Sequence, residues 1–557
     1  MEIPDKQHAL QIVGPEQVTL NRDKDVPTPG PYQFLCRVVV VGVCFSDLKL
    51  LKQFSSHARK SEVISGIDED VLEENPCYVP GEQPAVPGHE PVVEVVQTGS
   101  KVAHFKPGES YFIQADWRWL KTANSNGAFG YNFEGAMQEY TLLDERIVFS
   151  PEGECMLLPV EQGGRSASAF SLVEPWACVE ESYRSPERQG VQQNGSLLVV
   201  CDTQPEDGVL TEVFKVCDAP SRLVWIGEMS EDPLPVKPEK ADAISELESE
   251  EFDDIIYFGS SADTLERLFA VCADHGLLNL VLCGGRFERE VVTPLGGVHY
   301  QGIRLTGTNG THPLEGYSTI PASGEIRDND TIHIAGAGGP MGTMHVVRNI
   351  RRGFQGITVY AGDLSEERLA TLDKIAAPAA EDSGASYQSY NPEKAPLTSA
   401  VDYAVIMVPV PDLVAEAVNK SNRNGIINIF AGIPTDKTGT IDMNTYVDKG
   451  LYFIGTSGSV MEDMRVVLQR VQAGQLDTNV SVAAVCGLDG APEALEAVKN
   501  QEVDGKIMLY PQCRGLDLTK LEELKEKAPE IAAQLDNGVW TLSAENILLA
   551  EYGCGVL

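Results

Sequence analysis

Two stretches of the chain repeat one another, and this repetition constrains the fold more than any other feature. Residues 253–285 align with residues 401–433. Gly307 and Gly455 continue the alignment at the same separation of 148 positions. Each copy alternates apolar strand-like runs with helical periods, which is typical of a parallel sheet covered by helices. The sequence therefore predicts two doubly wound α/β domains in tandem.

The chain before and after these copies has a different texture. Short β-branched runs broken by Gly, Pro and Asp fill the first 150 residues and predict a β domain. The acidic stretch 55–83 is predicted to be an excursion from its core. The expected domains are a catalytic domain in 1–192, a first doubly wound domain in 193–322, a second in 323–458, and a return to the catalytic domain with a helical tail in 459–557.

The second copy opens with a glycine-rich turn, IAGAGGPMG, at residues 334–342. A strand, a tight glycine turn and a helix start in this order hold the pyrophosphate of a dinucleotide in many proteins. Counted back from Gly342, alanine takes the first glycine place; counted from Gly336, the third glycine falls one residue late. The alternative is a turn that only connects a strand to a helix. The residues expected to line the pyrophosphate are Ala337, Gly339, Pro340, Met341 and Gly342.

An aspartate follows the next strand of this copy. Asp363 ends the run GITVYAGD, where a carboxylate accepts hydrogen bonds from both ribose hydroxyls of an adenosine. The same carboxylate repels a 2′-phosphate, so the sequence favours NAD over NADP. Arg368 keeps NADP open, because it would either meet that phosphate or stack on adenine.

The first copy lacks these features at the matching turn. It has CDTQPEDG at residues 201–208, and glycine is required where the backbone must approach a pyrophosphate. The carboxylates of Asp202 and Glu206 would repel phosphates at a helix N-terminus. We expect the first copy to be structural, for example as an interface.

A second constellation lies in the β-rich part of the chain. Cys44 ends one strand-like run, His89 and Glu90 begin another, and Glu174 stands at a helix start. A single buried cysteine or histidine more often serves packing, but a thiolate, an imidazole and a carboxylate from separate segments suit a catalytic zinc with one open position. Ser46, two residues after the thiolate, is placed to relay a proton from the substrate oxygen.

Taken together, these motifs resemble the medium-chain zinc alcohol dehydrogenase superfamily. GHEPVVEVVQTGSKVAHFKPGE and GAMQEYTLL are similar to its landmarks, and CFSD with EP resembles its polyol dehydrogenase branch, in which glutamate replaces a cysteine ligand. AGGPMG, NIFAGIPTDKTG and FIGTSGSVMEDM resemble the sorbose 1-phosphate reductase group. The resemblance implies a GroES-like catalytic β-barrel domain with two tandem Rossmann-like doubly wound parallel-sheet domains. It implies metal ligands Cys44, His89 and Glu174, with Glu90 beside the metal or as an exchangeable ligand.

Two departures from that pattern carry expectations of their own. The cysteine-rich loop that holds a structural zinc in many relatives has no counterpart, since residues 108–135 contain no cysteine. We therefore expect one zinc. The extra doubly wound domain either alters the substrate cleft or packs where a partner subunit would sit. The resemblance also implies a homo-oligomer, a dimer or a tetramer.

The sequence thus predicts a zinc-dependent NAD(H) oxidoreductase that interconverts a secondary alcohol and a ketone on a polyol, sugar or sugar phosphate. Glu90 and Ser46 are the candidate catalytic residues. The resemblance places Trp117, Trp119 and Phe129 at the substrate cleft, and Arg118 and Lys49 are the nearest cations for a substrate phosphate. Core packing and ordinary surface charge are the alternatives for these five. Two other functions stay open, a catalytically inert binding or scaffold homologue and a zinc-independent reductase.

Charge limits the partners. The chain has 43 Lys and Arg against 82 Asp and Glu, a net charge of −39. Such a surface repels nucleic-acid phosphates and anionic lipid, so we expect no nucleic acid and no membrane among the partners. The sequence has no apolar run of membrane-spanning length and no signal-peptide pattern at its start. We expect a cytoplasmic protein that acts on a small molecule.

Overall fold

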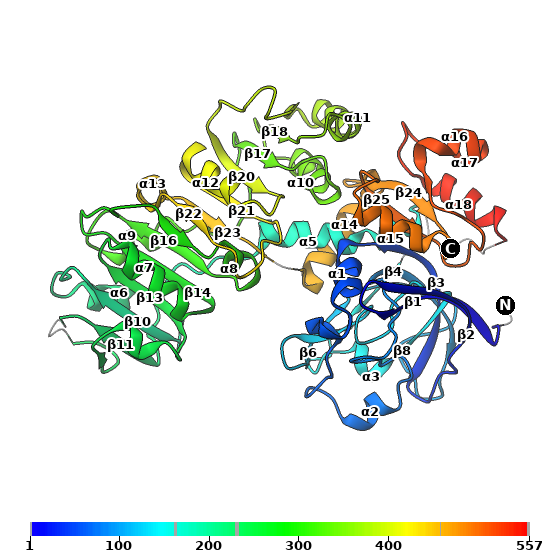
Figure 1. Ribbon diagram of the computed structural model, residues 1–557, viewed down its shortest axis with the longest axis horizontal. Coiled ribbons are helices and arrows are strands. Elements are labelled where there is room, and N and C mark those ends of the chain that lie inside the picture. Colours follow the sequence, from blue (N-terminus) through cyan, green and yellow to red (C-terminus); the bar gives the residue numbers. More distant parts are fainter. Residues whose placement is uncertain (1–2, 161–163, 229–232, 457, 554–557) are drawn as a thin grey trace. The chain divides into compact units, whose positions relative to one another are not determined.

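A computed structural model describes residues 3–160, 164–228, 233–456 and 458–553. The chain forms two compact units (Figure 1). The first comprises Met1–Ala177 and Ser459–Leu557, and the second comprises Cys178–Gly458. Within the described ranges, every helix is too short or too polar to cross a membrane.

An eight-stranded sheet forms the body of the first unit. Its strand order is β26-β24-β25-β3-β4-β5-β9, and β8 also pairs with β3. All eleven residues of β3 are buried, because the strand crosses the centre of the sheet. The strands are β3 (Gln33–Val43), β4 (Glu90–Thr98), β5 (Ser110–Ile113), β8 (Tyr140–Asp144), β9 (Leu157–Pro159), β24 (Val482–Cys486), β25 (Lys506–Leu509) and β26 (Thr519–Lys520).

Two hairpins and several short helices complete this unit. The hairpin strands are β1 (Lys6–Gly14), β2 (Gln17–Asp25), β6 (Asp116–Lys121) and β7 (Asn126–Ala128). The N-terminal helices are α1 (Phe45–Gln53), α2 (Glu69–Glu73), α3 (Glu145–Val148) and α4 (Ala167–Ser171). The C-terminal helices are α14 (Met461–Gln472), α15 (Ala491–Lys499), α16 (Leu524–Lys527), α17 (Pro529–Ala532) and α18 (Leu542–Glu551).

The acidic stretch 55–83 is better packed than we expected. Lys60, Val71, Leu72 and Val79 are all buried. The Lys60 ammonium donates to the Val79 carbonyl, so the buried charge is hydrogen-bonded. The prediction of an excursion from the core was wrong here, because the few apolar residues of the stretch pack inward while its carboxylates face water.

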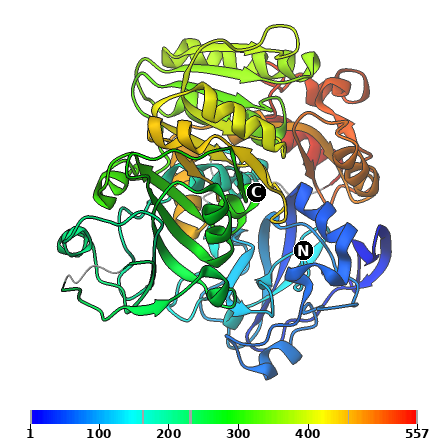
Figure 2. The same ribbon diagram turned by 60° about the vertical axis from the view of Figure 1, so that its left-hand side comes forward.

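The second unit holds two six-stranded parallel sheets. When the strands of each sheet are numbered from 1 to 6 in chain order, both sheets have the spatial order 3-2-1-4-5-6. Figure 2 shows both from a second side. We call residues 196–317 the first repeat and residues 331–454 the second repeat. The fold is therefore a β-rich unit with two Rossmann-like domains, as the sequence predicted.

The first repeat contains β10 (Ser196–Cys201), β11 (Arg222–Ile226), β12 (Glu239–Ala241), β13 (Phe252–Phe258), β14 (Cys272–Val281) and β16 (Arg304–Thr308). Its helices are α6 (Val209–Val216), α7 (Ala262–Leu268), α8 (Leu295–Tyr300) and α9 (Pro313–Tyr317). Helix α5 (Val173–Arg184) precedes it.

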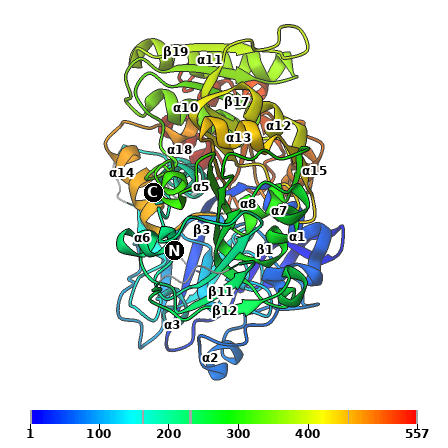
Figure 3. The ribbon, with the colours of Figure 1, turned by 90° about the vertical axis from the view of Figure 1, so that its left-hand side faces the viewer.

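The second repeat contains β17 (Thr331–Ala335), β18 (Thr358–Gly362), β19 (Ser386–Tyr390), β20 (Val401–Ile406), β21 (Ser421–Ile429) and β23 (Tyr452–Ile454). Its helices are α10 (Pro340–Arg351), α11 (Glu366–Ser383), α12 (Pro411–Lys420) and α13 (Met443–Lys449). Helix α10 packs on α11 and α12 packs on α13 (Figure 3).

The strand pairings fix which positions of the two repeats correspond. Leu198 and Ile332 occupy the same place in β10 and β17, because they face Ile255 and Tyr403 one strand over. By the same register Val224 of β11 corresponds to Val359 of β18. Two short strands, β15 (Val291–Thr293) and β22 (Gly439–Ile441), link the repeats as an antiparallel pair.

Candidate metal centre and dinucleotide site

The candidate metal centre of the first unit is assembled by the register of its sheet. Gly42, near the end of β3, faces Glu90 at the start of β4. On the other side of β3, Val43 faces Ile507 of β25. The residue after β3 is Cys44 and the residue before β4 is His89, so the pairing brings a thiol, an imidazole and a carboxylate to one end of three neighbouring strands.

Asp47 fixes the two turns that carry the cysteine and the histidine. Its Oδ2 accepts a hydrogen bond of 2.9 Å from the amide of Cys44, and its Oδ1 accepts one of 3.1 Å from the amide of Gly88. Asp47 itself is 1% exposed. It therefore joins the start of α1 to the turn before β4, a role that the sequence analysis did not assign.

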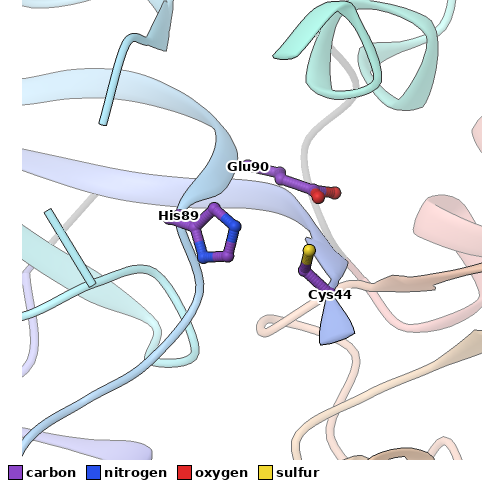
Figure 4. Close-up of side chains that lie close together, drawn as sticks. All are labelled: Cys44, His89 and Glu90. Carbon is purple, nitrogen blue, oxygen red and sulfur yellow. The ribbon is translucent and has the colours of Figure 1, made fainter. Parts of the chain in front are cut away.

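Cys44, His89 and Glu90 converge. Their ligand atoms all lie within 4.8 Å of one another, and Figure 4 shows the thiol, the imidazole and the carboxylate directed toward a common point. Cys44 is half-buried, whereas His89 and Glu90 are buried. Among the described residues these three form the group; Glu174 lies outside it.

Glu90 is held by a buried lysine. Lys506 Nζ lies 2.6 Å from Glu90 Oε1, and both side chains are 5% exposed or less. A side chain at position 42 would collide with the Glu90 carboxylate, so Gly42 leaves the room that it occupies. The neighbouring charge of Glu90 outweighs burial and raises the pKa of Lys506. The Glu90 carboxylate is thus fixed by the Lys506 ammonium on its Oε1 side.

Two atoms of this cluster lack a hydrogen-bond partner in the described structure. They are Glu90 Oε2 and His89 Nδ1, both buried. Asp47 Oδ1 is 3.3 Å from His89 Nδ1 without the geometry of a hydrogen bond. Buried polar atoms left in this state are costly unless something binds them. A thiol, an imidazole and a carboxylate that converge in this way form a donor set that fits zinc.

The electrostatics of the cluster also favour a cation. Burial opposes protonation of His89, but the neighbouring oxygens of Tyr131 and Asp47 outweigh it and hold the pKa of the imidazole well above its ordinary value. Burial, and then the charge of Glu90, raise the pKa of Glu174 to about 7. Glu174 lies in the first turn of α5. The charges of Glu90 and His89 therefore act on its carboxylate, although this carboxylate is not one of the converging ligand groups.

Other residues singled out in the sequence have distinct environments. Ser46 is half-buried in the first turn of α1, beside Asp47. Trp117 is buried and packs edge-on against Phe133, with ring centroids 4.8 Å apart, and Phe129 is fully buried nearby. Arg118 donates to the carbonyl of Ser459 at 3.0 Å. The two buried aromatic side chains serve the core.

Three residues near the cluster, Arg59, Tyr131 and His57, could not be identified as site residues from the sequence. Arg59 forms an ion pair of 3.0 Å with Asp116 and lies 5.4 Å from the centre of the Tyr131 ring. Tyr131 in turn lies 5.7 Å from the ring of His89. Burial, and then the charge of Arg59, lower the pKa of His57 to about 4. These contacts join segments far apart in the sequence, so composition and spacing could not reveal them.

The glycine turn of the second repeat has the shape of a phosphate cradle. Gly336 adopts a left-handed backbone, with φ of +85°. A methyl group on Gly342 would lie 2.8 Å from Cα of Ala337, so only glycine lets α10 pack this closely on the turn. Gly339 is open on its side-chain face, where the nearest atom would be 3.9 Å away. Helix α10 starts at Pro340 with no acidic residue in its first turn, which suits an anion.

Asp363 is fixed against this turn. Its Oδ2 accepts a hydrogen bond of 3.0 Å from the amide of Gly338, and its Oδ1 accepts one of 2.9 Å from the amide of Ser365. Arg368 is half-buried and lies beside Gly338, since a methyl group on that glycine would reach Cβ of the arginine. The structure therefore gathers the predicted dinucleotide residues at the carboxyl end of β17 and β18, where such ligands bind.

The first repeat has a different turn at the matching place. Asp202 follows β10, and its Oδ2 accepts hydrogen bonds from the hydroxyls of Tyr257 and Thr264, at 2.6 Å and 3.0 Å. Helix α6 starts only at Val209 and carries Glu212 in its first turn. The first repeat thus has a carboxylate where the second repeat has Gly336.

Comparison with known proteins finds one family model that matches part of the chain. Residues 30–152 match the alcohol dehydrogenase GroES-like domain. The fold resembles that of 2R,3R-butanediol dehydrogenase from Bacillus subtilis, with a TM-score of 0.52 and 15% identity, over 91% of this chain and 100% of that one.

Three curated proteins are similar in sequence. Uncharacterized protein YggP of Escherichia coli (strain K12) is 26% identical over 252 residues, 42% of this chain and 59% of its own length. Mannitol-1-phosphate 5-dehydrogenase of Aliivibrio fischeri (strain ATCC 700601 / ES114) is 24% identical over 379 residues, which are 61% of this chain and 83% of its own length. L-sorbose 1-phosphate reductase of Klebsiella pneumoniae is 33% identical over 157 residues, which are 27% of this chain and 36% of its own length. This chain thus spans less than two thirds of two of these relatives.

Proposed function

We propose that this chain, a medium-chain alcohol/polyol dehydrogenase by its GroES-like domain and fold, is a zinc-dependent NAD(H) oxidoreductase that interconverts a secondary alcohol and a ketone. The observation that carries the proposal is the convergence of Cys44, His89 and Glu90, in which the buried Glu90 Oε2 has no hydrogen-bond partner. The inert homologue and the metal-free reductase have no use for that arrangement.

In this proposal Cys44, His89 and Glu174 hold one metal ion, with Glu90 beside it or exchanging with a ligand. Bound zinc supplies a Lewis acid that lowers the pKa of the substrate hydroxyl. Asp47 positions the turns of Cys44 and His89, and Lys506 holds Glu90 in place. Glu174 must move toward the group on binding, because its carboxylate stands outside the converging atoms.

The second repeat would hold NAD(H). The start of α10 would face the pyrophosphate, Gly339 would leave it room, and Gly342 lets the helix pack close to the turn. Asp363 accepts the hydrogen bonds of the adenosine ribose, which favours NAD over NADP, and Arg368 lies beside the adenine. Bound NAD⁺ supplies the hydride acceptor.

In the oxidation, bound NAD⁺ would take up the hydride that leaves the carbinol carbon, and the Ser46 hydroxyl would pass the proton of the substrate hydroxyl to solvent. The products would be a ketone, NADH and that proton, and the reverse reaction would consume all three. Ser46 is the candidate for this proton transfer because it is half-buried and lies two residues after Cys44.

For the substrate we propose a polyol, sugar or sugar phosphate. The printed names of two relatives, a mannitol 1-phosphate dehydrogenase and a sorbose 1-phosphate reductase, support this class. For the domain plan we propose the division at 192, 322 and 458, with residues 193–322 and 323–458 derived from one duplicated domain.

The test is metal content per chain together with NAD binding, measured on wild type, Cys44→Ser and Cys155→Ser. Cys155 is also half-buried, and among the described residues it is not part of the converging group, so it is the matched control. We expect about one zinc per chain in wild type and in the control, loss of zinc in Cys44→Ser, and NAD binding in all three. Wild type without zinc would overturn the mechanism.

A further inference from the structure

The two repeats meet through equivalent surfaces. Edge strands β16 and β23 lie side by side (Figure 1), and β15 pairs with β22. One hydrophobic core runs through both repeats and includes Leu280 and Leu305 from the first and Ile427 and Phe453 from the second. The interface is therefore part of the folded core of the unit.

The pairing of β15 with β22 is symmetric. Val291 faces Ile441, and Thr293 faces Gly439. Ile441 is the counterpart of Thr293 in the other repeat, and Gly439 is the counterpart of Val291, since each pair is 148 positions apart. The central pair joins Val292 to its own counterpart, Thr440. A two-fold axis relating the repeats passes between these two residues.

Contacts farther from the axis obey the same rule. A methyl group on Gly307 would lie 3.0 Å from Val447 Cγ2, and one on Gly455 would lie 2.9 Å from His299 Cα. Gly455 is the counterpart of Gly307, and Val447 is the counterpart of His299. The two contacts are therefore one contact made twice.

A third contact is also made twice. The amide of Phe287 donates to Asn444 Oδ1 at 3.0 Å. At the counterpart positions, a methyl group on Gly296 would lie 2.7 Å from Cα of Thr435. An interface in which residue i meets j and j meets i is isologous, the kind that two identical subunits form around a two-fold axis. Here both surfaces belong to one chain.

We infer that the first repeat is a built-in partner subunit for the second, so that the protein is a monomer whose internal symmetry replaces a homodimer. This explains why the first repeat keeps the strand order and the interface of the second while its turn has lost the phosphate cradle. The inference takes the place of the homo-oligomer that the resemblance implied. It concerns assembly and does not depend on the proposed function.

The built-in partner also supports the dinucleotide site. Gly296, in α8 of the first repeat, packs against the backbone of Pro434 and Thr435. These residues follow β21 at the carboxyl end of the second sheet, the edge where dinucleotides bind. Helix α8 therefore positions a loop beside the proposed NAD site. This part of the inference rests on the proposed function.

Assembly is tested with a cysteine pair on the axis. Val292 and Thr440 are exposed and directly opposed in an antiparallel pair, whose Cα separation suits a disulfide. We expect V292C/T440C, after oxidation, to form the 292–440 bond within one chain by peptide mass spectrometry, and each single variant to form none. Native mass spectrometry should give one chain per particle for wild type. A 292–440 bond between two chains, no such bond, or a dimeric wild type would overturn the inference.

The supporting role is tested with neighbouring glycines. A methyl group at Gly296 meets the backbone of Pro434, whereas one at Gly297 meets only side chains of the first repeat. We expect Gly296→Ala to weaken NAD binding about fivefold and Gly297→Ala to change it less than about twofold. Equal affinities in both variants would overturn the supporting role. If the wild-type protein does not bind NAD at all, the result instead contradicts the proposed function.

Discussion

The two repeats share a strand order and differ at one turn. Both sheets run 3-2-1-4-5-6, and both carry an aspartate at the start of the fourth strand in this order, Asp254 and Asp402. After the first strand, however, the second repeat has Gly336 and the first has Asp202. The comparison teaches that packing between strands and helices maintains the fold, whereas ligand binding depends on a few backbone positions that packing does not need.

The difference is chemical as well as geometric. In the second repeat the amide of Gly338 donates to Asp363, the amides of Gly336 and Ala337 donate to the carbonyl of Gly362, and α10 begins at Pro340 with no acidic residue in its first turn. In the first repeat the Asp202 carboxylate occupies the same end of the sheet and accepts hydrogen bonds from its own neighbours. The first turn thus carries a carboxylate and is followed by a helix with Glu212 in its first turn, whereas the helix after the second turn begins without an acidic residue, which suits an anion.

The largest expected effect comes from the glycine that closes the turn. Gly342→Ala places a methyl group 2.8 Å from the backbone of Ala337, so α10 must shift away from the turn. We expect the NAD dissociation constant to rise at least about tenfold and the free energy of unfolding to fall by about 1–3 kcal/mol. Isothermal titration calorimetry and urea denaturation measure the two.

The control is the corresponding glycine of the first repeat. Gly208 has φ of +87° and open space around it, so Gly208→Ala costs only backbone strain of about 1 kcal/mol. NAD affinity should not change. If Gly208→Ala also weakens NAD binding, the first repeat contributes to the dinucleotide site and the contrast drawn above fails.

The next effect concerns the group that joins the repeats. Glu187 Oε2 lies 2.8 Å from Arg304 Nε and accepts a hydrogen bond of 2.8 Å from the Tyr452 hydroxyl. Arg304 and Tyr452 are counterparts on the two edge strands. Glu187→Gln removes the carboxylate that pairs with the nearly buried guanidinium of Arg304, so we expect the free energy of unfolding to fall by about 2–3 kcal/mol. Tyr452→Phe removes one hydrogen bond and should cost about 1 kcal/mol. A smaller loss for Glu187→Gln than for Tyr452→Phe would show that the ion pair does not stabilise the interface.

Acid should destabilise the second repeat through a buried histidine that the first repeat lacks at the corresponding position. His345 in α10 is buried, and burial lowers its pKa to about 3. As the pH falls, the imidazole is protonated in the unfolded chain before it is protonated in the folded chain. Stability is therefore unaffected by this group above pH 6.5 and is lost progressively as the pH falls from 6.5 toward 3. The corresponding residue of the first repeat is Thr211, which does not titrate.

The measurement is urea denaturation at pH 7 and at pH 4.5. Wild type should lose about 2 kcal/mol more stability between these values than His345→Gln. Thr211→Ser is the control and should follow wild type. Parallel pH profiles for wild type and His345→Gln would show that the histidine does not stay neutral in the fold.

A further effect on NAD binding is expected at the ribose carboxylate. Asp363→Asn keeps the hydrogen bond from Gly338 but loses the charge, so NAD binding should weaken about tenfold and discrimination against NADP should fall. The corresponding residue in the first repeat is the exposed Glu228. Glu228→Gln should bind NAD as wild type does. Unchanged affinity in Asp363→Asn would remove the carboxylate from the proposed NAD site.

Much of the fold was readable from local patterns. Alternating strand-like and helical periods indicated two doubly wound domains, because side chains buried on both faces of a parallel sheet leave apolar runs. The glycine turn and Asp363 were found from their spacing, since a dinucleotide imposes that spacing on a short segment. Cys44, His89 and Glu90 were found because each stands at the end of a strand-like run.

The rest depended on residues brought together from afar. Lys506 reaches Glu90 across 416 positions of sequence. Gly42 matters only because β3 faces β4 in one register, and Arg59 lies in a stretch predicted to leave the core. Local patterns carry no information about such contacts, because strand register and loop packing are set by the whole sheet.

The sequence by itself determined the elements, the repetition and the chemistry available at each strand end. The tertiary structure alone decided that the repeats meet around a two-fold axis at Val292 and Thr440, and that Lys506 pairs with Glu90. The physical reason is the range of the interactions: hydrogen-bonding periods and turn conformations act over a few residues, whereas edge-strand burial and the pairing of buried charges act between segments that only the folded core brings into contact.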